Sequence, residues 1–530
     1  MIILLFVLFF LAAGVSLVLG IRHTLHMFQL NSYQYQAQGR YFKTHLFQTA
    51  YPVIGLVLFG LMAGGFAGTS VAAAAVTGIP GIFYMAGLAV LYRPKKAKKK
   101  LVITARVKRL ILTTVIAALL VGILSAVTVG GARGSWWGLL AAAMLVTTLS
   151  PYLVLLANLI NKPVEKGINR YYINDARRML KACPNLKIIG ITGSFGKTSV
   201  KYYLHTLLSA GFDVLMTPES YNTPMGVVKT VRGSLRATHE IFLCEMGARH
   251  VGDIKEICDI VDPHMGVITS LGHQHLETFH SLDNVVSTKM ELFDALPEGG
   301  PRYINGDNEI VKQYGVAKGA VTYGLGESND YHAFDLVYSE KGSTFKVQAP
   351  DGSVAEYTTK MLGEHNVVNI TGAIAVAHDL GISLEKLKMP VRRLEGAPHR
   401  LQPIAKSAKL TIIDDAYNSN PNGTKMALQT LSMFEGVKVL VTPGMVELGS
   451  EEDRYNFEFG VDAGRVCDYI VLVGKKQTES IQKGVCSTDF AQEKLYVAEN
   501  LQDGLNYVYS ITSNEKIIVL LENDLPDNYL

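Results

Sequence analysis

Cysteine is scarce in this sequence of 530 residues, and its pattern argues against a disulfide-stabilised fold. The chain contains five cysteines, which show neither paired spacing nor a Cys-x-x-Cys motif. These five are Cys183, Cys244, Cys258, Cys467 and Cys486. Such a pattern is typical of reduced thiols in a cytosolic environment.

Acidic residues are nearly absent from the first third of the chain. The first 180 residues contain 18 of the 50 Lys and Arg residues but only two of the 46 Asp and Glu residues, Glu165 and Asp175. The remaining 350 residues contain 32 basic and 44 acidic side chains, so the two parts carry net charges of +16 and −12. Two physically different regions are therefore joined in one chain.

Charge of either sign is missing from two long segments, residues 2–20 and 51–92. An uncharged apolar run of about 20 residues can cross the hydrocarbon core of a bilayer, and the second segment is long enough to cross twice with a turn near residues 64–70. Residues 110–129 and 136–160 are two further candidates. A cleaved signal peptide is the alternative for residues 2–20, but no basic residue precedes this run.

The cations between these segments predict the orientation of a membrane region at residues 1–168 with about five helices. Residues 93–109 contain nine Lys and Arg residues, and short loops of this kind stay in the cytoplasm. This places everything after residue 160 inside. We therefore expect a multi-pass protein of the cell membrane, in contact with membrane lipid, whose catalytic domains are cytoplasmic. The flanking spans explain the lysine run without a nucleic-acid partner.

After a connector at residues 169–185, the pattern changes to alternating strands and helices. Apolar runs at residues 187–191, 241–244 and 265–269 each precede a helical stretch, which favours a parallel sheet covered by helices. The fold class is therefore α/β.

A domain boundary is predicted where the segment Glu-Gly-Ala-Pro-His-Arg, residues 395–400, interrupts this pattern. A second series of strands and helices starts at residue 410. The sequence thus predicts one domain at residues 186–398 and another at residues 399–530.

The strongest local signal is a glycine-containing turn between an apolar strand and a helix. It consists of Gly193, Ser194, Phe195, Gly196, Lys197, Thr198 and Ser199. Backbone N–H groups at such a turn bind phosphates, a lysine reaches the terminal phosphates, and a hydroxyl binds Mg²⁺. The spacing is two residues shorter between the glycines than in the usual P-loop. The cofactors predicted from this turn are ATP and Mg²⁺.

The Thr-Gly-Ser-Phe-Gly-Lys-Thr segment resembles that of the Mur ligase family, which joins amino acids or peptides to cell-wall precursors. The resemblance implies a P-loop central domain followed by a Rossmann-like C-terminal domain. It also implies that Glu245, in Glu-Met-Gly, and His275 bind Mg²⁺ together with Thr198, and that Lys289 is a carbamylated lysine bridging metal ions. Taken singly, these residues are more often ordinary polar side chains. His273 and His275 could also be read as a zinc pair, although no further ligands stand at suitable spacing.

Further motifs follow in the order that the family shows. By this resemblance Asn366 and Asn369 contact adenine, although both could also be helix caps. Arg400 would stabilise the transferred phosphoryl group, and Asp415 would contact the ribose.

Substrate contacts are implied in two segments, at Asn222 and Thr223 and at Tyr417, Asn418 and Asn420. These segments are most similar to those of members that add D-alanyl-D-alanine to a muramoyl tripeptide. Two departures stand out. Membrane spans take the place of the domain that binds the UDP group, and the chain lacks a Lys-Gly-Ser-Arg type of ending.

The predicted function is an ATP-dependent amide ligase that acts through an acyl phosphate. Lys197, Glu245, His275, Lys289 and Arg400 form the predicted catalytic set. The substrates would be a small-molecule or lipid-linked cell-wall precursor and an amino acid or dipeptide, with cell-wall synthesis proteins as possible partners. Two alternatives remain open at this stage, a poly-γ-glutamate synthase and an inactive nucleotide-binding scaffold in the membrane.

Overall fold

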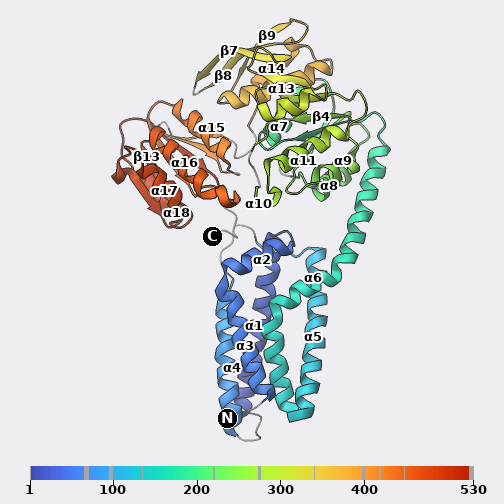
Figure 1. Ribbon diagram of the computed structural model, residues 1–530, viewed down its shortest axis with the longest axis vertical. Coiled ribbons are helices and arrows are strands. Elements are labelled where there is room, and N and C mark those ends of the chain that lie inside the picture. The colour runs from blue at the N-terminus through green and yellow to red at the C-terminus, as the bar shows by residue number, and fades with distance from the viewer. Residues whose placement is uncertain are drawn as a thin grey trace. The chain divides into compact units, whose positions relative to one another are not determined.

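A computed structural model describes residues 2–64, 71–94, 100–133, 135–218, 221–272, 276–339, 341–396, 401–407, 409–416, 419–446 and 448–524 (Figure 1). The chain divides into two compact units, and the boundary falls between Arg170 and Tyr171.

The first unit is helical. Its elements are α1 (Ile2–Leu30), α2 (Tyr35–Thr44), α3 (Leu46–Gly64), α4 (Val71–Leu91), α5 (Ala105–Arg133) and the first part of α6 (Ser135–Lys181). Among the described residues, α1, α5 and α6 are long and apolar enough to cross a membrane, while α3 and α4 contain the shorter apolar stretches Ala50–Ala63 and Gly78–Leu91. Helices thus occupy all five predicted apolar segments. The predicted turn between α3 and α4 lies almost wholly outside the described residues.

Apolar side chains lie both inside and outside this helical unit. Phe9 of α1, Met85 of α4 and Trp137 of α6 belong to one buried cluster. On the outside, Leu120 of α5 is 64% exposed and Leu11 of α1 is 63% exposed. Soluble proteins seldom expose many large apolar side chains on one group of helices, so these helices are candidates to cross a membrane.

Helix α6 continues through the unit boundary, and its last turns, from Tyr171 to Lys181, belong to the second unit. Ala176 and Leu180 lie in a buried cluster with side chains of the first sheet. The Asp175 carboxylate pairs with Arg232 at 2.7 Å, and Arg177 donates to the Asp259 carbonyl at 3.0 Å. Most of the predicted connector, up to Lys181, is therefore the end of one long helix rather than a separate element.

The second unit contains a nine-stranded sheet in the order β2-β3-β1-β4-β5-β6-β7-β8-β9. The strands are β1 (Lys187–Thr192), β2 (Val214–Met216), β3 (Ile241–Glu245), β4 (Met265–Ile268), β5 (Arg302–Asn305), β6 (Val321–Gly324), β7 (Tyr331–Ser339), β8 (Gly342–Gln348) and β9 (Val354–Thr359). The pairs from β2 to β7 are parallel, and β8 pairs antiparallel with β7 and with β9. The predicted runs correspond to β1, β3 and β4, so the parallel-sheet prediction is confirmed.

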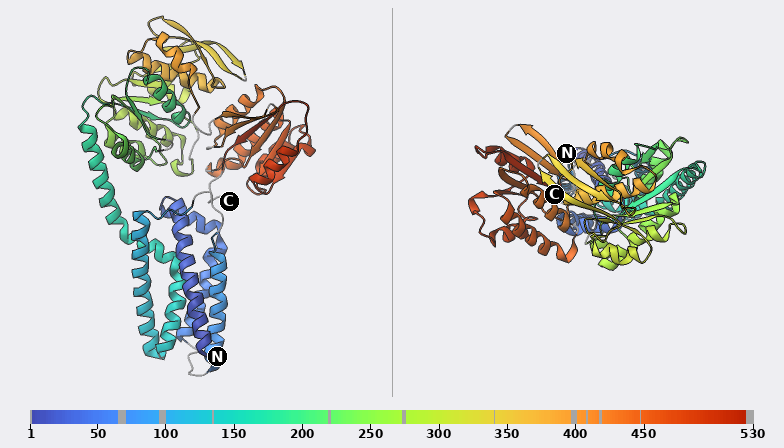
Figure 2. Two further views of the ribbon diagram at one scale, coloured as in Figure 1. Left: turned by 180° about the vertical axis from the view of Figure 1, so that it is seen from behind. Right: turned by 90° about the horizontal axis from the view of Figure 1, so that it is seen from above.

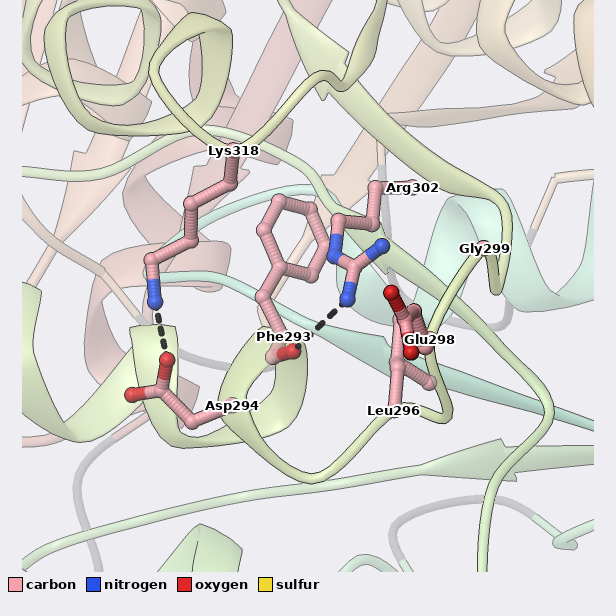
Figure 3. Close-up of a pocket in the computed structure, with 7 residues that line it drawn as sticks. All are labelled: Phe293, Asp294, Leu296, Glu298, Gly299, Arg302 and Lys318. Atoms are coloured by element: carbon pink, nitrogen blue, oxygen red, sulfur yellow. Dashed lines mark hydrogen bonds and ion pairs between the residues drawn. The ribbon is translucent and has the colours of Figure 1, made fainter.

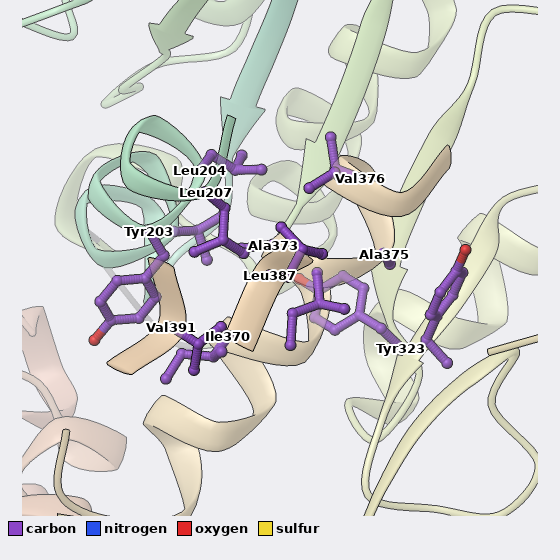
Figure 4. Packing of buried hydrophobic residues seen from close by; sticks show 14 of the residues in the cluster. Tyr203, Leu204, Leu207, Tyr323, Ile370, Ala373, Ala375, Val376, Leu387 and Val391 are labelled. Atoms are coloured by element: carbon purple, nitrogen blue, oxygen red, sulfur yellow. The ribbon is translucent and has the colours of Figure 1, made fainter. Parts of the chain in front are cut away.

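Helices cover both faces of this sheet. On one face lie α7 (Lys197–Leu208), α13 (Glu364–Asp379) and α14 (Leu384–Arg392). Figure 4 shows Leu204 and Leu207 of α7 meeting Ile370 and Ala373 of α13 there. On the other face lie α8 (Pro224–Ser234), α9 (Asp253–Val261) and α11 (Leu282–Asp294). The short helices α10 (Leu276–Phe279) and α12 (Glu309–Val316) flank the sheet.

A six-stranded sheet follows, in the order β10-β11-β15-β12-β13-β14 (Figure 2). Its strands are β10 (Gln402–Ser407), β11 (Leu410–Asp415), β12 (Val437–Thr442), β13 (Tyr469–Val473), β14 (Leu495–Ala498) and β15 (Ile517–Glu522). Only the β10–β11 pair is antiparallel among these described strands. The predicted start at residue 410 is therefore one strand late, because the edge strand β10 precedes it.

The six-stranded sheet is also covered on both faces. The helices are α15 (Pro421–Ser432), α16 (Glu452–Val466), α17 (Glu479–Cys486) and α18 (Leu501–Ser510), with short 3₁₀ turns at Gly449–Glu451 and Gln492–Lys494. Leu428, Phe459 and Ile481 of the first three helices pack on one face. Val508 of α18 packs on the other. A parallel sheet with helices on both faces is the doubly wound arrangement expected of a Rossmann-like domain.

Candidate active site

The turn between β1 and α7 lies at the carboxyl edge of the nine-stranded sheet. β1 is flanked by β3 and β4, and Ile191 of β1 pairs with Glu245 at the end of β3. Because parallel strands end at the same edge, residues that follow all three strands meet around this turn. Helix α7 begins at Lys197 directly after the turn, so its unpaired N-terminal N–H groups face the same place.

Two glycines allow the turn to adopt its shape. Gly193 has φ 147° and Gly196 has φ 79°, both in the region that favours glycine. A Cβ atom at Gly193 would lie 2.1 Å from the Thr269 hydroxyl, and one at Gly196 would lie 2.9 Å from the Asn369 Oδ1. Ser194 and Phe195 donate their N–H groups to the Ser270 carbonyl, at 2.7 and 3.2 Å, which fixes the turn against the end of β4.

Lys197 closes over its own turn. Its Nζ donates to the Gly193 carbonyl at 2.7 Å and to the Ser194 carbonyl at 3.0 Å. The ammonium group is therefore held at the mouth of the turn, where a phosphate would be bound.

Glu245 is the centre of a buried polar cluster beside the turn. Its side chain is 1% exposed. Oε1 accepts hydrogen bonds from the Thr198 hydroxyl at 3.2 Å and from the Asn222 amide at 3.1 Å. The Thr217 hydroxyl accepts the Glu245 N–H at 3.1 Å. Three of the predicted residues, Thr198, Asn222 and Glu245, are thus brought together.

Lys201 joins this cluster, although the sequence analysis did not identify it. Its Nζ lies 2.9 Å from Glu245 Oε2, and its side chain is 0% exposed. In the sequence, Lys201 differs from other lysines only in standing one helical turn after Lys197. Its ion pair with Glu245 at the end of β3 depends on tertiary structure and cannot be read from the sequence.

Lys289 of α11 is buried at 2% exposure. Burial is the main cause that lowers its pKa well below the usual lysine range, and the nearby Lys197 charge lowers the pKa further. A lowered pKa favours the neutral amine, and the neutral amine is the form of lysine that reacts with CO₂ to give a carbamate.

The two predicted adenine contacts have different surroundings. The Asn366 Oδ1 accepts from the Tyr203 hydroxyl at 2.6 Å, and its Nδ2 donates to the Leu362 carbonyl at 2.7 Å. Both polar ends of Asn366 are thus used within the protein. Asn369 instead lies against Gly196 of the turn.

Several predicted residues lie outside the described part of the chain. They are His273, His275, Arg400, Tyr417 and Asn418. Among the described residues, no group of three His, Cys, Asp or Glu side chains is placed to hold a metal. The hydroxyl of Thr198 and the carboxylate of Glu245 are the predicted metal ligands that the structure does bring together.

Substrate-side candidates sit at the starts of two helices. Thr223 caps α8, where its hydroxyl accepts the Gly226 N–H at 3.4 Å. Asn420 caps α15, where its Oδ1 accepts the Gly423 N–H at 2.8 Å. Asp415 ends β11, and its Oδ1 accepts the Leu401 N–H at 3.2 Å.

A separate hollow of about 420 Å³ lies where α11 ends and β5 begins (Figure 3). Parallel strands begin at the edge opposite their carboxyl ends, so this hollow is on the other edge of the sheet from the turn. Its cations already bind protein atoms: Lys318 pairs with Asp294, and Arg302 donates to the Gly300 carbonyl at 2.8 Å. The hollow is therefore not part of the candidate site.

Two segments of the chain match known domain families. Residues 191–377 match the Mur ligase middle domain. Residues 399–521 match the Mur ligase, glutamate ligase domain. The chain is also 30% identical over 334 residues to the UDP-N-acetylmuramoyl-tripeptide--D-alanyl-D-alanine ligase of Escherichia coli, which covers 60% of this chain and 73% of that relative.

Solved structures give a concordant result. A crystal structure of MurF from Acinetobacter baumannii is 27% identical, has a TM-score of 0.61, and covers 68% of this chain and 78% of that one. The MurF ligase of Thermotoga maritima in complex with ADP has a TM-score of 0.61 at 23% identity, covering 67% of this chain and 80% of that one. The latter similarity concerns the fold alone.

Proposed function

Because this chain belongs to the Mur ligase family and is therefore an ATP-dependent amide ligase, we propose that it adds D-alanyl-D-alanine to a muramoyl-peptide precursor. The observation that carries this proposal is the cluster at the turn after β1. There Lys197, Thr198 and the buried Glu245 meet at the N-terminus of α7. The E. coli relative is named for the same acceptor and dipeptide.

Mg²⁺ fits this cluster. Thr198 and Glu245 offer a hydroxyl and a carboxylate oxygen 3.2 Å apart, and hard oxygen ligands are those that Mg²⁺ prefers. We propose that these two residues hold the ion, with His275 as a further ligand implied by the family motif. Bound there, Mg²⁺ would neutralise charge on the triphosphate.

The reaction proposed has two steps. The γ-phosphoryl group of ATP passes to a carboxylate of the precursor, and ADP leaves. The amine of the dipeptide then attacks the acyl carbon of the acyl phosphate, and inorganic phosphate leaves. Both steps concentrate negative charge, so positioning and electrostatic stabilisation are the main tasks of the protein.

The described side chains match these tasks. The Lys197 Nζ donates to two carbonyl oxygens of the turn. Phosphate oxygens are acceptors of the same kind, so they can replace these carbonyls as its partners. The N–H groups at the start of α7 add positive potential on the same side. We also propose that Lys289 carries a carbamate, since burial and the Lys197 charge both lower the pKa of its amine. Arg400 and Asp415 are proposed to contact the nucleotide from the second domain.

The first unit supports attachment to a membrane. Its helices are long and apolar, and outward-facing residues such as Leu11 and Leu120 are more than 60% exposed. We propose that residues 1–168 anchor the enzyme in the cell membrane with its catalytic domains in the cytoplasm. A membrane-fixed ligase of this kind can use a lipid-linked as well as a UDP-linked precursor.

The test uses the purified full-length protein in lipid nanodiscs with ATP and Mg²⁺. UDP-linked and lipid-linked muramoyl tripeptides are each offered with D-alanyl-D-alanine or with glutamate, and ADP and ligated product are measured, the product by mass spectrometry. We expect ADP release that depends on D-alanyl-D-alanine, and a product heavier than the precursor by the mass of the dipeptide less one water. Release that depends on glutamate alone would contradict the proposed substrate, and an absence of ligation with every pair would contradict the proposed activity.

A further inference from the structure

Glu522 occupies a central place at the carboxyl edge of the six-stranded sheet. It is the last residue of β15, the strand that lies between β11 and β12. Its side chain is buried at 2% exposure. The segments that follow β11 and β12 leave the sheet at this same edge, which is where doubly wound sheets bind ligands.

The Glu522 carboxyl group is bonded to both of these segments. The Ser419 hydroxyl, which follows β11, donates to Oε1. The Thr442 hydroxyl, which ends β12, donates to Oε2 at 2.7 Å and also accepts the Gly444 N–H at 3.0 Å. One buried side chain therefore joins Ser419, just before α15, to Thr442 at the end of β12.

The next residue, Asn523, also bonds to both the end of β11 and the segment after β12. The Asn523 Nδ2 donates to the Gly444 carbonyl at 2.6 Å, and the Asn523 N–H donates to the Asp415 carbonyl at 3.2 Å. Asn523 has φ 65°, a conformation that asparagine tolerates better than most residues. Glu522 and Asn523 stand in the part of the chain where a Lys-Gly-Ser-Arg type of ending was expected.

The Glu522 carboxyl group has a raised pKa, which favours its uncharged form in this buried position. Burial, as the main cause, raises the pKa of Glu522 to about 8, with the Asp415 charge adding to the rise and the two hydroxyls opposing it. At neutral pH the side chain is thus mostly an uncharged acid, which can both donate and accept hydrogen bonds.

We propose that Glu522 is a positioning residue for the incoming amine, holding the start of α15 and the end of β12 in one arrangement through Ser419 and Thr442. This inference rests on the proposed function, because Asn420, which follows Ser419 and caps α15, is a proposed substrate contact. The residue acts through other side chains and does not itself touch the substrate. Its loss should therefore weaken the use of the amine without affecting the use of ATP.

The test compares four variants of the full-length protein. Glu522→Ala removes both hydrogen bonds, whereas Glu522→Gln keeps a neutral group of the same shape. Ser419→Ala removes one bond only. Glu515→Ala serves as a matched control, because Glu515 lies exposed just before the same strand. Steady-state kinetics then separate the two substrates.

We expect Glu522→Ala to raise the KM for D-alanyl-D-alanine by about tenfold or more, while the KM for ATP changes by less than about twofold. Glu522→Gln should restore the KM for the dipeptide to within about threefold of the original enzyme. A similar rise in both KM values, or a failure of Gln to rescue, would overturn the positioning role.

Hydrogen exchange tests the linkage without relying on activity. In Glu522→Ala, peptides from residues 414–423 and 440–450 should both exchange faster, and in Ser419→Ala only the first should do so. Faster exchange confined to β15 would refute the linkage. If the original enzyme ligates no amine at all, the proposed function fails, but exchange still decides whether Glu522 joins the two segments.

Discussion

Lys197 donates two hydrogen bonds to carbonyls of its own turn, so a bound triphosphate must compete with these carbonyls for the ammonium group. Lys197→Ala removes the charge that would stabilise the transferred phosphoryl group. We expect ADP release to fall by on the order of 10²- to 10³-fold, with the fold intact. Lys187→Ala, at the exposed start of β1, should leave ADP release unchanged. Equal ADP release by both variants would argue against the assigned role of Lys197.

Lys201 and Glu245 form an ion pair at 2.9 Å with side-chain exposures of 0% and 1%. Removing one partner from such a pair leaves an uncompensated buried charge, so Lys201→Met should reduce the free energy of unfolding by about 3 to 5 kcal/mol. The exposed pair of Lys255 and Asp259 provides a control. Lys255→Met should cost less than about 1 kcal/mol. Urea unfolding followed by circular dichroism measures both, and similar small losses would contradict this account of the pair.

Glu522 predicts a dependence of stability on pH. Its folded pKa of about 8 lies above the usual value of 4.5, so between these values the folded state binds the extra proton. The free energy of unfolding should therefore fall as the pH rises from about 4.5 to about 8 and then level off, as far as this group is concerned. Glu522→Gln lacks the titrating group.

The melting temperature of Glu522→Gln relative to the original protein, measured at pH 5 and at pH 9, tests this sign. The two proteins should differ little at pH 5, and the variant should melt higher at pH 9. A variant that melts lower at pH 9 than the original protein would show that the ionised carboxylate stabilises the fold.

Single residues also show where sequence reasoning ends. The turn from Gly193 to Thr198 and the strand-end position of Glu245 followed from local pattern, because a strand, glycines and a helix are all encoded within a few residues. Lys201 and Glu522 did not, because each acquires its role from a partner far away in the chain, at Glu245 and at Thr442.

Among the elements, the strands next to the nucleotide turn were predicted best. β1, β3 and β4 are continuous apolar runs that are buried on both faces, so composition alone identifies them. The antiparallel strands β7, β8 and β9 and the edge strand β10 were not predicted. β7, β8 and β9 alternate between buried and more exposed residues, which is a weaker signal than a wholly apolar run.

Helix α6 differs from expectation in its length, since it runs from Ser135 to Lys181 with Pro151 and Pro163 inside it. An amphipathic pattern suggested a separate connector at residues 169–185, yet Ala176 and Leu180 bury one face of this stretch against the first sheet. Packing, rather than local composition, keeps this stretch helical.

This packing makes a prediction for α6. Ala176→Asp would place a charge in a position with 0% exposure and should reduce the free energy of unfolding by about 3 kcal/mol. Asn174→Asp introduces the same carboxylate at an exposed neighbouring position and should have little effect. Comparable melting temperatures for the two variants would show that the end of α6 is not docked as described.

For the molecule as a whole, charge distribution predicted two regions, and the division of the chain near Arg170 agrees with it. The proposed orientation can be tested with a thiol reagent that does not cross membranes. Cys486 is exposed on the protein and should stay unlabelled in intact cells, because it would lie in the cytoplasm. A cysteine introduced by Gly131→Cys, in the last turn of α5, should be labelled when Cys486 is replaced by Ser. The reverse pattern would invert the topology.

The unbroken course of α6 has a further consequence for turnover. A ligase anchored in the membrane as proposed, rather than released into bulk solution, would meet a lipid-linked precursor at the surface density of that membrane. Its rate would then scale with the number of precursor molecules per unit area, and dilution of the cell contents would slow it only through the soluble amine and ATP. Supply of the precursor by a neighbouring enzyme in the same layer would accordingly govern flux more strongly than the total cellular pool.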